Sequence, residues 1–396
     1  MRLPLLLISI VFVLGLVVDL YLYKRLRHAR APRGLCIAYA VVGVVGALLL
    51  ITLLAMPKRS GSDSQLLVIM WLLYGYFTVY LPKYMMALFC LAQQLLARIT
   101  RRRMRGVAIT GAVVASLLAG GLIWGATVGR NTIDVRYVEV PVRDLPAAFD
   151  GFKIVQLSDI HVGSYGDDTT FTSRLVECVN ALDPDIICFT GDIVNRHSSE
   201  LRPFMGTLSG LDAPAGVWSV MGNHDYGDYY NWPSEATHRA DADSLKQMQA
   251  AMGWNMLNNS HCLLRRGNDT IVLIGVENIG DAPFPVYGSL GRAYPDIADS
   301  AVKVLMTHNP AHWTDSIADN PDANIALTLS GHTHAMQMAL GRFSPASMRY
   351  RTWGGLYADS LARQLYVNIG TGMVAIPARL GTALPEVTVI TLKSVK

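Results

Sequence analysis

The chain has 396 residues, of which 51% are hydrophobic and only 16% are charged, which excludes both a disordered chain and an ordinary soluble protein. Residues 1–130 carry 15 Lys+Arg against two acidic residues, whereas the remainder carries 19 against 28. A basic, apolar first third before an acidic remainder indicates a membrane part and a water-soluble part. Membrane topology explains the basic excess, so no nucleic-acid partner is expected.

Four apolar stretches predict a transmembrane region over residues 1–129. The expected spans are residues 3–23, 34–56, 65–82 and 106–128, and a span needs roughly 20 residues. The third stretch is interrupted by Pro82 and Lys83. It either ends near Tyr80 and is followed by an interfacial helix, or it continues as a longer, kinked helix. Asp19, near the end of the first span, is expected to extend its carboxylate to the membrane surface.

The basic residues between the spans predict an orientation. Five of them lie between the first and second spans and five between the third and fourth, whereas the middle loop has only Lys58 and Arg59. The positive-inside bias places the two rich loops in the cytoplasm. Both ends of the chain, and with them the domain that follows the fourth span, are then expected on the extracytoplasmic side.

Residues 130–396 have a different sequence pattern, in which short apolar runs are separated by helical stretches and later by turns. Strands alternating with helices, followed mainly by strands, predict an α/β domain with two packed sheets. The expected strands are residues 153–157, 185–189, 217–221, 270–276, 302–306, 325–329, 365–368 and 387–392, and the expected helices are residues 169–182 and 240–252.

Five polar clusters each follow one of these strands. Open α/β sheets place their sites at the carboxyl ends of strands, so the clusters are expected to converge on one edge. Carboxylate, imidazole and amide oxygen suit Mn²⁺, Fe or Zn²⁺, and the lack of thiolates argues against a structural zinc site. The clusters are Ser158–His161, Thr190–Asn195, Gly222–Asp225, Thr307–His308 and Ser330–His334.

The residue types of the clusters are those that a site for two metal ions needs. Asp192 is central in the set, and a carboxylate has two oxygens with which to bridge two ions. If the backbone is extended, alternation places Asp159 and His161 on one face, and likewise His332 and His334.

Taken in order, the clusters resemble the D-x-H, G-D-x-x-[DN], G-N-H-[DE], H and G-H-x-H motifs of the calcineurin-like metallophosphoesterase superfamily. The resemblance is to its membrane-anchored bacterial branch and to transmembrane proteins with a metallophosphoesterase domain. It covers about residues 152–392 and implies a two-sheet αββα sandwich after an all-α transmembrane bundle. It also implies two divalent metal ions, one held by Asp159, His161, Asp192 and His334, the other by Asp192, Asn223, His308 and His332.

The same resemblance implies that His224 donates a proton to the leaving group. In the protein-phosphatase branch an acid orients this histidine, whereas here that position is Asn195, whose amide can orient an imidazole but cannot stabilise its charge. Asp225 is the candidate to compensate, and Arg196 is the candidate to contact the phosphate. Two aromatic segments, residues 226–232 and 348–357, either wall a lipid or sugar pocket or pack as ordinary loops.

These features predict a membrane-anchored, dinuclear-metal phosphoesterase. Its substrate would be a phosphomonoester, phosphodiester or pyrophosphate, lipid-linked or close to the membrane. Relatives include enzymes that cleave the pyrophosphate of UDP-2,3-diacylglucosamine in lipid A synthesis, although that substrate requires a cytoplasmic catalytic face, contrary to the expected orientation. The other alternative is a receptor or scaffold that binds metal without catalysis. Degenerate members usually lose ligands, and none is missing here.

Overall fold

The computed structural model describes residues 5–56, 61–102, 104–280, 285–294 and 300–395. The chain divides into two compact units, Met1–Thr127 with Ala375–Pro377, and Val128–Val374 with Ala378–Lys396. The first two residues of the first expected span and the loop residues Lys58 and Arg59 lie outside the described residues.

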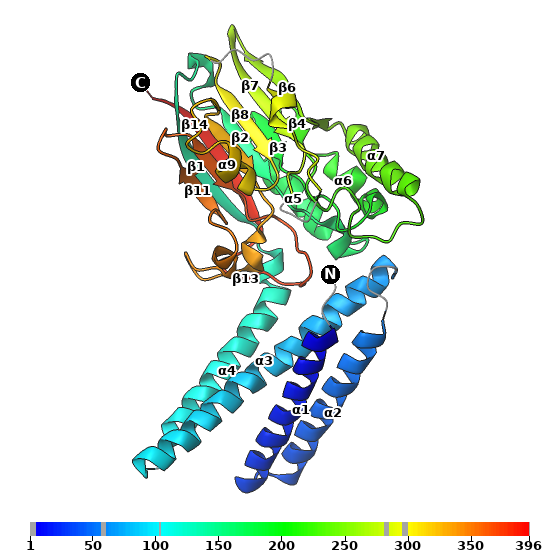
Figure 1. Cartoon of the computed structure of the whole chain (residues 1–396), viewed down its shortest axis with the longest axis vertical. Helices are drawn as coiled ribbons and strands as arrows, with labels where there is room; N and C mark the ends of the chain where they lie inside the picture. Colours follow the sequence, from blue (N-terminus) through cyan, green and yellow to red (C-terminus); the bar gives the residue numbers. More distant parts are fainter. Residues whose placement is uncertain (1–4, 57–60, 103, 281–284, 295–299, 396) are drawn as a thin grey trace. The chain divides into compact units, whose positions relative to one another are not determined.

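Where the structure describes it, the first unit is α-helical, as predicted, and its helices occupy the four apolar stretches (Figure 1). Helix α3 packs against α4, and α1 packs against α2. Among the described residues, α2, α3 and α4 are long and apolar enough to cross a membrane. The four helices are α1 (Leu5–His28), α2 (Arg33–Ala55), α3 (Asp63–Thr100) and α4 (Arg105–Thr127).

Helix α3 is one continuous helix of 38 residues that contains Pro82. The helix continues through Pro82 without a break, and the end of the membrane span within it stays a prediction. A proline inside a helix removes one backbone hydrogen bond and costs about 3 kcal/mol. The packing of α3 against α1, α2 and α4 outweighs that cost.

Asp19 lies inside the helix bundle, contrary to the expectation that it reaches the membrane surface. Its carboxylate accepts hydrogen bonds from Lys83 Nζ at 2.8 Å, Tyr39 Oη at 3.0 Å and Tyr80 Oη at 2.7 Å. The side chains of Asp19 and Lys83 are only 13% and 11% exposed. A partly buried carboxylate is stable here because a cation and two hydroxyl groups satisfy both of its oxygens.

In the described residues, the second unit contains two six-stranded sheets and a two-stranded pair. The first sheet has the order β1 (Asp134–Arg143), β14 (Glu386–Val395), β2 (Lys153–Leu157), β3 (Ile186–Phe189), β4 (Val217–Ser219) and β5 (Asn255–Met256). The second has the order β11 (Gly355–Ala358), β12 (Gln364–Val367), β9 (Leu327–Ser330), β8 (Lys303–Thr307), β7 (Asp269–Val276) and β6 (Ser260–Arg266). The pair is β10 (Met338–Ala339) and β13 (Leu380–Gly381).

The two sheets pack face to face, and helices cover their outer faces, which confirms the αββα sandwich. Ile154 and Cys188 from the first sheet share one buried core with Val304 and Tyr366 from the second. The helices α5 (Thr170–Asn180), α6 (Met205–Leu208) and α7 (Glu235–Ala251) cover the first sheet, and α8 (Leu290–Ala293) and α9 (Ala311–Ser316) cover the second. The short 3-10 helices are η1 (Gly129–Asn131), η2 (Ala147–Phe149), η3 (Val162–Tyr165), η4 (Ser198–Phe204), η5 (His334–Gln337) and η6 (Pro345–Met348).

Strand direction decides where the polar clusters lie. Strands β2, β3 and β4 are parallel neighbours in the first sheet, and β7, β8, β9 and β12 are parallel neighbours in the second. The carboxyl ends of parallel strands meet at one edge of their sheet. The loops after β2, β3, β4, β8 and β9 carry the five polar clusters.

Candidate metal centre

The structure brings all seven predicted ligand residues together. One group of potential ligand atoms comes from Asp159, His161 and His334, and these atoms all lie within 4.8 Å of one another. His161 Nε2 is 3.1 Å from His334 Nε2, and Asp159 Oδ1 is 3.1 Å from His334 Nε2. Two imidazole nitrogens at hydrogen-bond distance cannot both use a lone pair toward each other, whereas a cation between them can accept both.

A second group lies beside the first and comes from Asp192, Asn223, His308 and His332. Asn223 Oδ1 is 3.1 Å from His308 Nε2 and 2.8 Å from His332 Nδ1, and these two ring nitrogens are 3.2 Å apart. His332 thus offers Nδ1 to the group, and its Nε2 lies 3.3 Å from Tyr350 Oη.

Asp192 lies between the two groups. Its Oδ2 is 3.6 Å from His161 Nε2 and 3.1 Å from His308 Nε2, and its Oδ1 accepts a hydrogen bond from the backbone N–H of His224 at 2.8 Å. One oxygen, Oδ2, therefore faces a ring from each group, so Asp192 is the carboxylate that the two groups share.

Burial and charge set the protonation of the cluster. Burial lowers the pKa of His161 and of His332 to about 3, so both rings are neutral near pH 7 and each has a lone pair. For His308 burial acts in the same direction, but the carboxylate of Asp192 outweighs it and raises the pKa to about 9. Burial opposes ionisation of Asp159 and Asp192, yet the neighbouring histidines hold the pKa of both carboxyls below the ordinary value.

Backbone carbonyls orient two of the rings. His161 Nδ1 lies 3.0 Å from the carbonyl oxygen of Val194, and His308 Nδ1 lies 2.8 Å from that of Thr190. A carbonyl only accepts, so each Nδ1 carries a proton and each Nε2 faces the cluster. The Nε2 of neutral His161 is a lone pair, whereas a metal ion would displace the second proton of His308 from its Nε2. Metal-binding histidines commonly have this outer hydrogen bond.

The residues fit divalent metal ions. Asp159 Oδ1 is buried, and its near neighbour is the ring nitrogen His334 Nε2 at 3.1 Å, without a well-aligned hydrogen bond. A buried carboxylate oxygen in this position is suited to a cation. Oxygen and imidazole nitrogen donors without thiolate suit Mn²⁺, Fe or Zn²⁺. The donor set therefore matches the chemistry of a metal site.

The ligand loops have unusual backbone conformations. Asp159 and His161 have φ of 54° and 48°, and His332 and His334 have φ of 75° and 51°. The prediction that an extended backbone aligns each pair is wrong, because left-handed turns direct the side chains to the cluster instead. Left-handed non-glycine residues carry strain of order 1–3 kcal/mol each, which is typical of functional sites. Gly222 is also required, because a Cβ there would collide with the carboxylate of Asp192.

His224 lies beside the first group, with its ring centroid 4.8 Å from that of His161. Its Nδ1 is 2.6 Å from the backbone carbonyl oxygen of Asn195, whose side-chain amide instead donates to Ser164 Oγ at 3.0 Å. Asn195 therefore holds His224, but the prediction that its side-chain amide does so is wrong. The backbone of Asn195 passes beside the His224 ring, so the carbonyl oxygen of Asn195 is nearer to that ring than its side-chain oxygen.

Asp225 does not compensate for the missing acid. Its carboxylate accepts backbone N–H bonds from Gly222, Asp192 and Ile193 at 2.8 to 2.9 Å and from Val194 at 3.3 Å. Asp225 thus ties the second motif loop to the third, and no hydrogen bond in the described part of the chain joins it to His224. Burial, followed by the charge of Asp192, raises its pKa to about 7, although the backbone N–H groups favour its charged form.

Arg196 is buried, and its guanidinium contacts two neighbouring side chains. Its Nε lies 3.8 Å from Glu200 Oε1, and its guanidinium carbon is 5.3 Å from the ring centroid of Tyr230. These contacts give the guanidinium a fixed place, and its contact with phosphate remains a prediction.

Two supporting residues were not singled out from the sequence. Tyr229 Oη accepts a hydrogen bond from Asn223 Nδ2 at 2.9 Å, and its ring stacks on His224 with 4.1 Å between centroids. Arg379 is fully buried and donates to the carbonyl oxygens of Ile369 and Gly370 at 2.9 Å, and to that of His334 at 3.3 Å. The signal for Tyr229 is its place in the aromatic segment after the third motif. Arg379 lies 45 residues after His334, and no sequence signal marked it.

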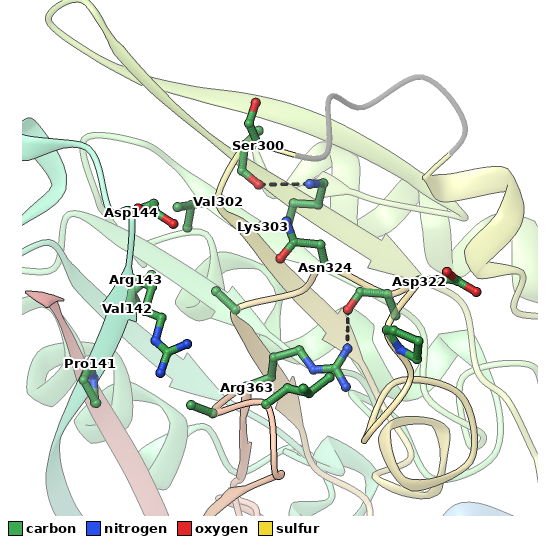
Figure 2. Close-up of a pocket in the computed structure, with 16 residues that line it drawn as sticks. Pro141, Val142, Arg143, Asp144, Ser300, Val302, Lys303, Asp322, Asn324 and Arg363 are labelled. Carbon is green, nitrogen blue, oxygen red and sulfur yellow. Dashed lines mark hydrogen bonds between the residues drawn. The ribbon is translucent and has the colours of Figure 1, made fainter. Parts of the chain in front are cut away.

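A separate cleft of about 590 Å³ lies at the amino ends of β8 and β12, away from the five motif loops (Figure 2). Two of its cations, Arg363 and Lys303, are held by the protein. Arg363 binds Asp359 at 2.7 Å, and Lys303 Nζ donates to the carbonyl oxygen of Ala301 at 2.9 Å. The cleft contains none of the predicted ligands, so cavity size alone does not locate the site.

Known proteins resemble both parts of the chain. Residues 152–336 match the family model described as calcineurin-like phosphoesterase, and residues 1–130 match one described as a probable calcineurin-like phosphoesterase transmembrane domain. A zebrafish (Danio rerio) transmembrane protein with metallophosphoesterase domain is 30% identical over 71% of this chain and 61% of its own length, so the match spans less than two thirds of that relative.

Two bacterial relatives match over nearly their whole length. The Bacillus subtilis metallophosphoesterase YkuE is 30% identical over 74% of this chain and 95% of its own length. The UDP-2,3-diacylglucosamine pyrophosphatase LpxG of Chlamydia muridarum is 26% identical over 67% of this chain and 91% of its own length. With an intact set of ligand residues and a matching transmembrane region, the chain belongs to the calcineurin-like metallophosphoesterase family of metal-dependent phosphoesterases and is a membrane protein of that family.

Proposed function

We propose that the chain is a membrane-anchored phosphoesterase that uses two divalent metal ions and acts on a lipid-linked or membrane-proximal substrate. Residues 1–129 form the anchor and residues 130–396 the catalytic domain. The observation that carries the proposal is the pair of ligand groups that share Asp192. Asp159, His161 and His334 hold one ion with Asp192, and Asn223, His308 and His332 hold the other.

When bound, the two ions supply positive charge that offsets the charge on the phosphoryl oxygens and lowers the pKa of a water molecule toward neutrality. The chain supplies the proton donor. Because His224 Nδ1 is held by the carbonyl of Asn195, the proton moves at Nε2. Burial lowers the pKa of His224 and so disfavours the form that carries a proton on Nε2, while the charge of Asp192 favours that form. Stacking on Tyr229 fixes the ring plane, so Nε2 is oriented before the leaving group arrives.

Chain connectivity supports a substrate at the membrane. Helix α4 ends at Thr127 and β1 begins at Asp134, so only a few residues join the last apolar helix to the catalytic domain. A domain on so short a connection works at the bilayer surface. The chlamydial relative is a pyrophosphatase by its name, and its substrate carries two acyl chains. A lipid-linked phosphoester or pyrophosphate is the substrate class that suits both observations.

The test uses the full-length protein, purified in detergent without chelator and supplied with Mn²⁺. We expect about two metal ions per chain, and turnover of p-nitrophenyl phosphate or bis-p-nitrophenyl phosphate that is lost in Asp192→Ala and His224→Ala. His261→Gln, which changes a histidine outside the motifs, is the matched control and should retain both. Folded protein that binds no Mn²⁺ contradicts the proposal, whereas metal binding without turnover of any phosphoester favours the receptor.

The orientation requires its own test, because the chlamydial relative's substrate and the positive-inside bias favour opposite sides. We propose an extracytoplasmic catalytic domain. In a bacterial host, protease added to spheroplasts should cleave the catalytic domain while a cytoplasmic control protein stays intact. Protection of the domain until the membrane is lysed would place it in the cytoplasm, where a UDP-linked substrate is available.

A further inference from the structure

A cluster of exposed apolar side chains lies in the segment that follows the metal ligand His334. Phe343 is 81% exposed, Leu340 75% and Met348 91%, and Met336 and Met338 are each more than 40% exposed. We call residues 336–348 the apolar loop. Soluble surfaces carry single exposed apolar residues, but a contiguous set of large ones marks an interaction surface.

In this loop the small side chains are buried and the large apolar side chains are exposed, the reverse of the usual pattern. Ala335 and Ala339 point inward and pack in a small core with Ile369 and Ala383, whereas the larger Met336, Met338 and Leu340 point outward. A loop that only had to cover its own domain would bury the large side chains, because burial of apolar area is favourable in water. The outward position of the large side chains therefore favours an apolar partner for this loop.

Backbone contacts hold the loop in this form. Leu340 and Phe343 exchange backbone hydrogen bonds of 2.8 and 3.2 Å across the two-residue turn of Gly341 and Arg342, which projects both apolar side chains. Ser344 Oγ donates to the carbonyl oxygen of Ala335 at 2.7 Å, which anchors the returning strand of the loop. The exposed set is thus presented by an ordered scaffold.

The charge of the segment identifies the partner. No acidic residue occurs between positions 331 and 358, whereas Arg342, Arg349 and Arg351 are present and exposed. The acidic balance of residues 131–396 makes this basic stretch a local exception. Apolar side chains flanked by arginines match the interface of an anionic bilayer, which attracts basic residues near its surface.

Both ends of the segment are attached to the metal cluster. Met336 is two residues beyond the ligand His334. On the other side, Tyr350 Oη lies 3.3 Å from the Nε2 of His332, and the hydroxyl of Thr333 donates to the carbonyl oxygen of Trp353. A bilayer surface that contacts the apolar loop is therefore adjacent to the candidate active site.

We propose that the apolar loop inserts Leu340, Phe343 and its methionines into the interface of an anionic lipid bilayer, and thereby seats the metal cluster at the level of lipid headgroups. This assignment rests on the proposed function for its purpose, since a lipid-linked phosphate would then reach the metals without leaving the membrane. The insertion itself is a property of the loop.

The test places the photocrosslinker p-benzoylphenylalanine at position 343 of the full-length protein, reconstituted in vesicles of phosphatidylglycerol and phosphatidylcholine. The matched control carries it at position 263, where Leu263 on β6 is 51% exposed in the same unit. After irradiation, lipid adducts identified by mass spectrometry should be about tenfold more abundant at 343 than at 263. Equal yields, or adducts that join two copies of the chain instead of lipid, would overturn the proposal.

Two further readouts complete the test. In vesicles of phosphatidylcholine alone the adduct yield at 343 should fall several-fold, because the arginines lose their anionic partner, and an unchanged yield contradicts the anionic assignment. The same preparations are assayed with Mn²⁺ and bis-p-nitrophenyl phosphate. Turnover without lipid adducts removes only the loop proposal, whereas lipid adducts without turnover support the loop and contradict the proposed catalysis.

Discussion

Removal of one hydroxyl group, by Tyr229→Phe, should weaken one of the two metal sites and leave the other intact. Asn223 directs Oδ1 at His308 and His332 only while its Nδ2 donates to Tyr229 Oη at 2.9 Å. Without that acceptor the amide loses its preferred orientation and leaves a partly buried donor unpaired, a cost of about 1–2 kcal/mol. That cost corresponds to about tenfold in affinity, within the roughly 10- to 100-fold effect of losing an outer hydrogen bond.

The assay is calorimetric titration of the metal-free full-length protein with Mn²⁺. The phenylalanine ring keeps the stacking on His224, so the pH profile of turnover at saturating Mn²⁺ should be unchanged. Tyr229→Leu, which removes the stacking as well, should alter that profile. Tyr287→Phe is the matched control, because its hydroxyl contacts Asp228 and no ligand, and it should bind both ions normally.

Equal weakening of both sites in Tyr229→Phe would refute the reasoning, because it would indicate general damage to the fold. Unchanged affinity at both sites would also refute it, because it would show that Asn223 is oriented without the tyrosine. Only a selective loss at one site agrees with the geometry.

Three other changes should have distinct outcomes. Asp192→Asn removes the shared carboxylate charge, so metal content measured by atomic emission should fall to about one ion per chain or less, with turnover lost. Gly222→Ala forces a Cβ against Asp192, and should lower the free energy of unfolding of the metal-free protein by about 1–3 kcal/mol in denaturant titrations. Burial lowers the pKa of His312 to about 4, below its unfolded value, so its contribution is present above about pH 6.5 and is lost as the pH falls toward 4. Between pH 7 and pH 5 this is a loss of about 2 kcal/mol that His312→Gln should abolish, and an equal pH dependence in both proteins contradicts it.

The strands before the motifs could be predicted because buried parallel strands appear in a sequence as uninterrupted apolar runs. The predicted run at residues 153–157 coincides with β2. Strand β1 escaped prediction because it alternates polar and apolar residues and contains Pro141, and its parallel partner β14 lies about 250 residues further along the chain. Local periodicity predicts single strands, but it does not predict which distant strands pair with one another.

The residues that form the metal cluster could be predicted from motif order, whereas the roles around them could not. Residue type indicates what a side chain is able to do, but the turn decides whether the side chain or the backbone is presented. Asn195 holds His224 with its carbonyl, and Asp225 turns its carboxylate toward backbone N–H groups. Both outcomes depend on turn conformations that no spacing reveals. Tyr229 was one of several neighbouring aromatic residues, and only the structure distinguishes it.

The ion pair of Asp19 and Lys83 has a consequence for how the protein is made. The two residues are 64 positions apart, so the first helix leaves the ribosome long before its neutralising partner has been synthesised. An unpaired carboxylate is costly in a bilayer, at about 2.5–3.5 kcal/mol on translocon-insertion scales. Helix α1 carries this cost until α3 supplies Lys83, which favours the packing of α1, α2 and α3 with one another.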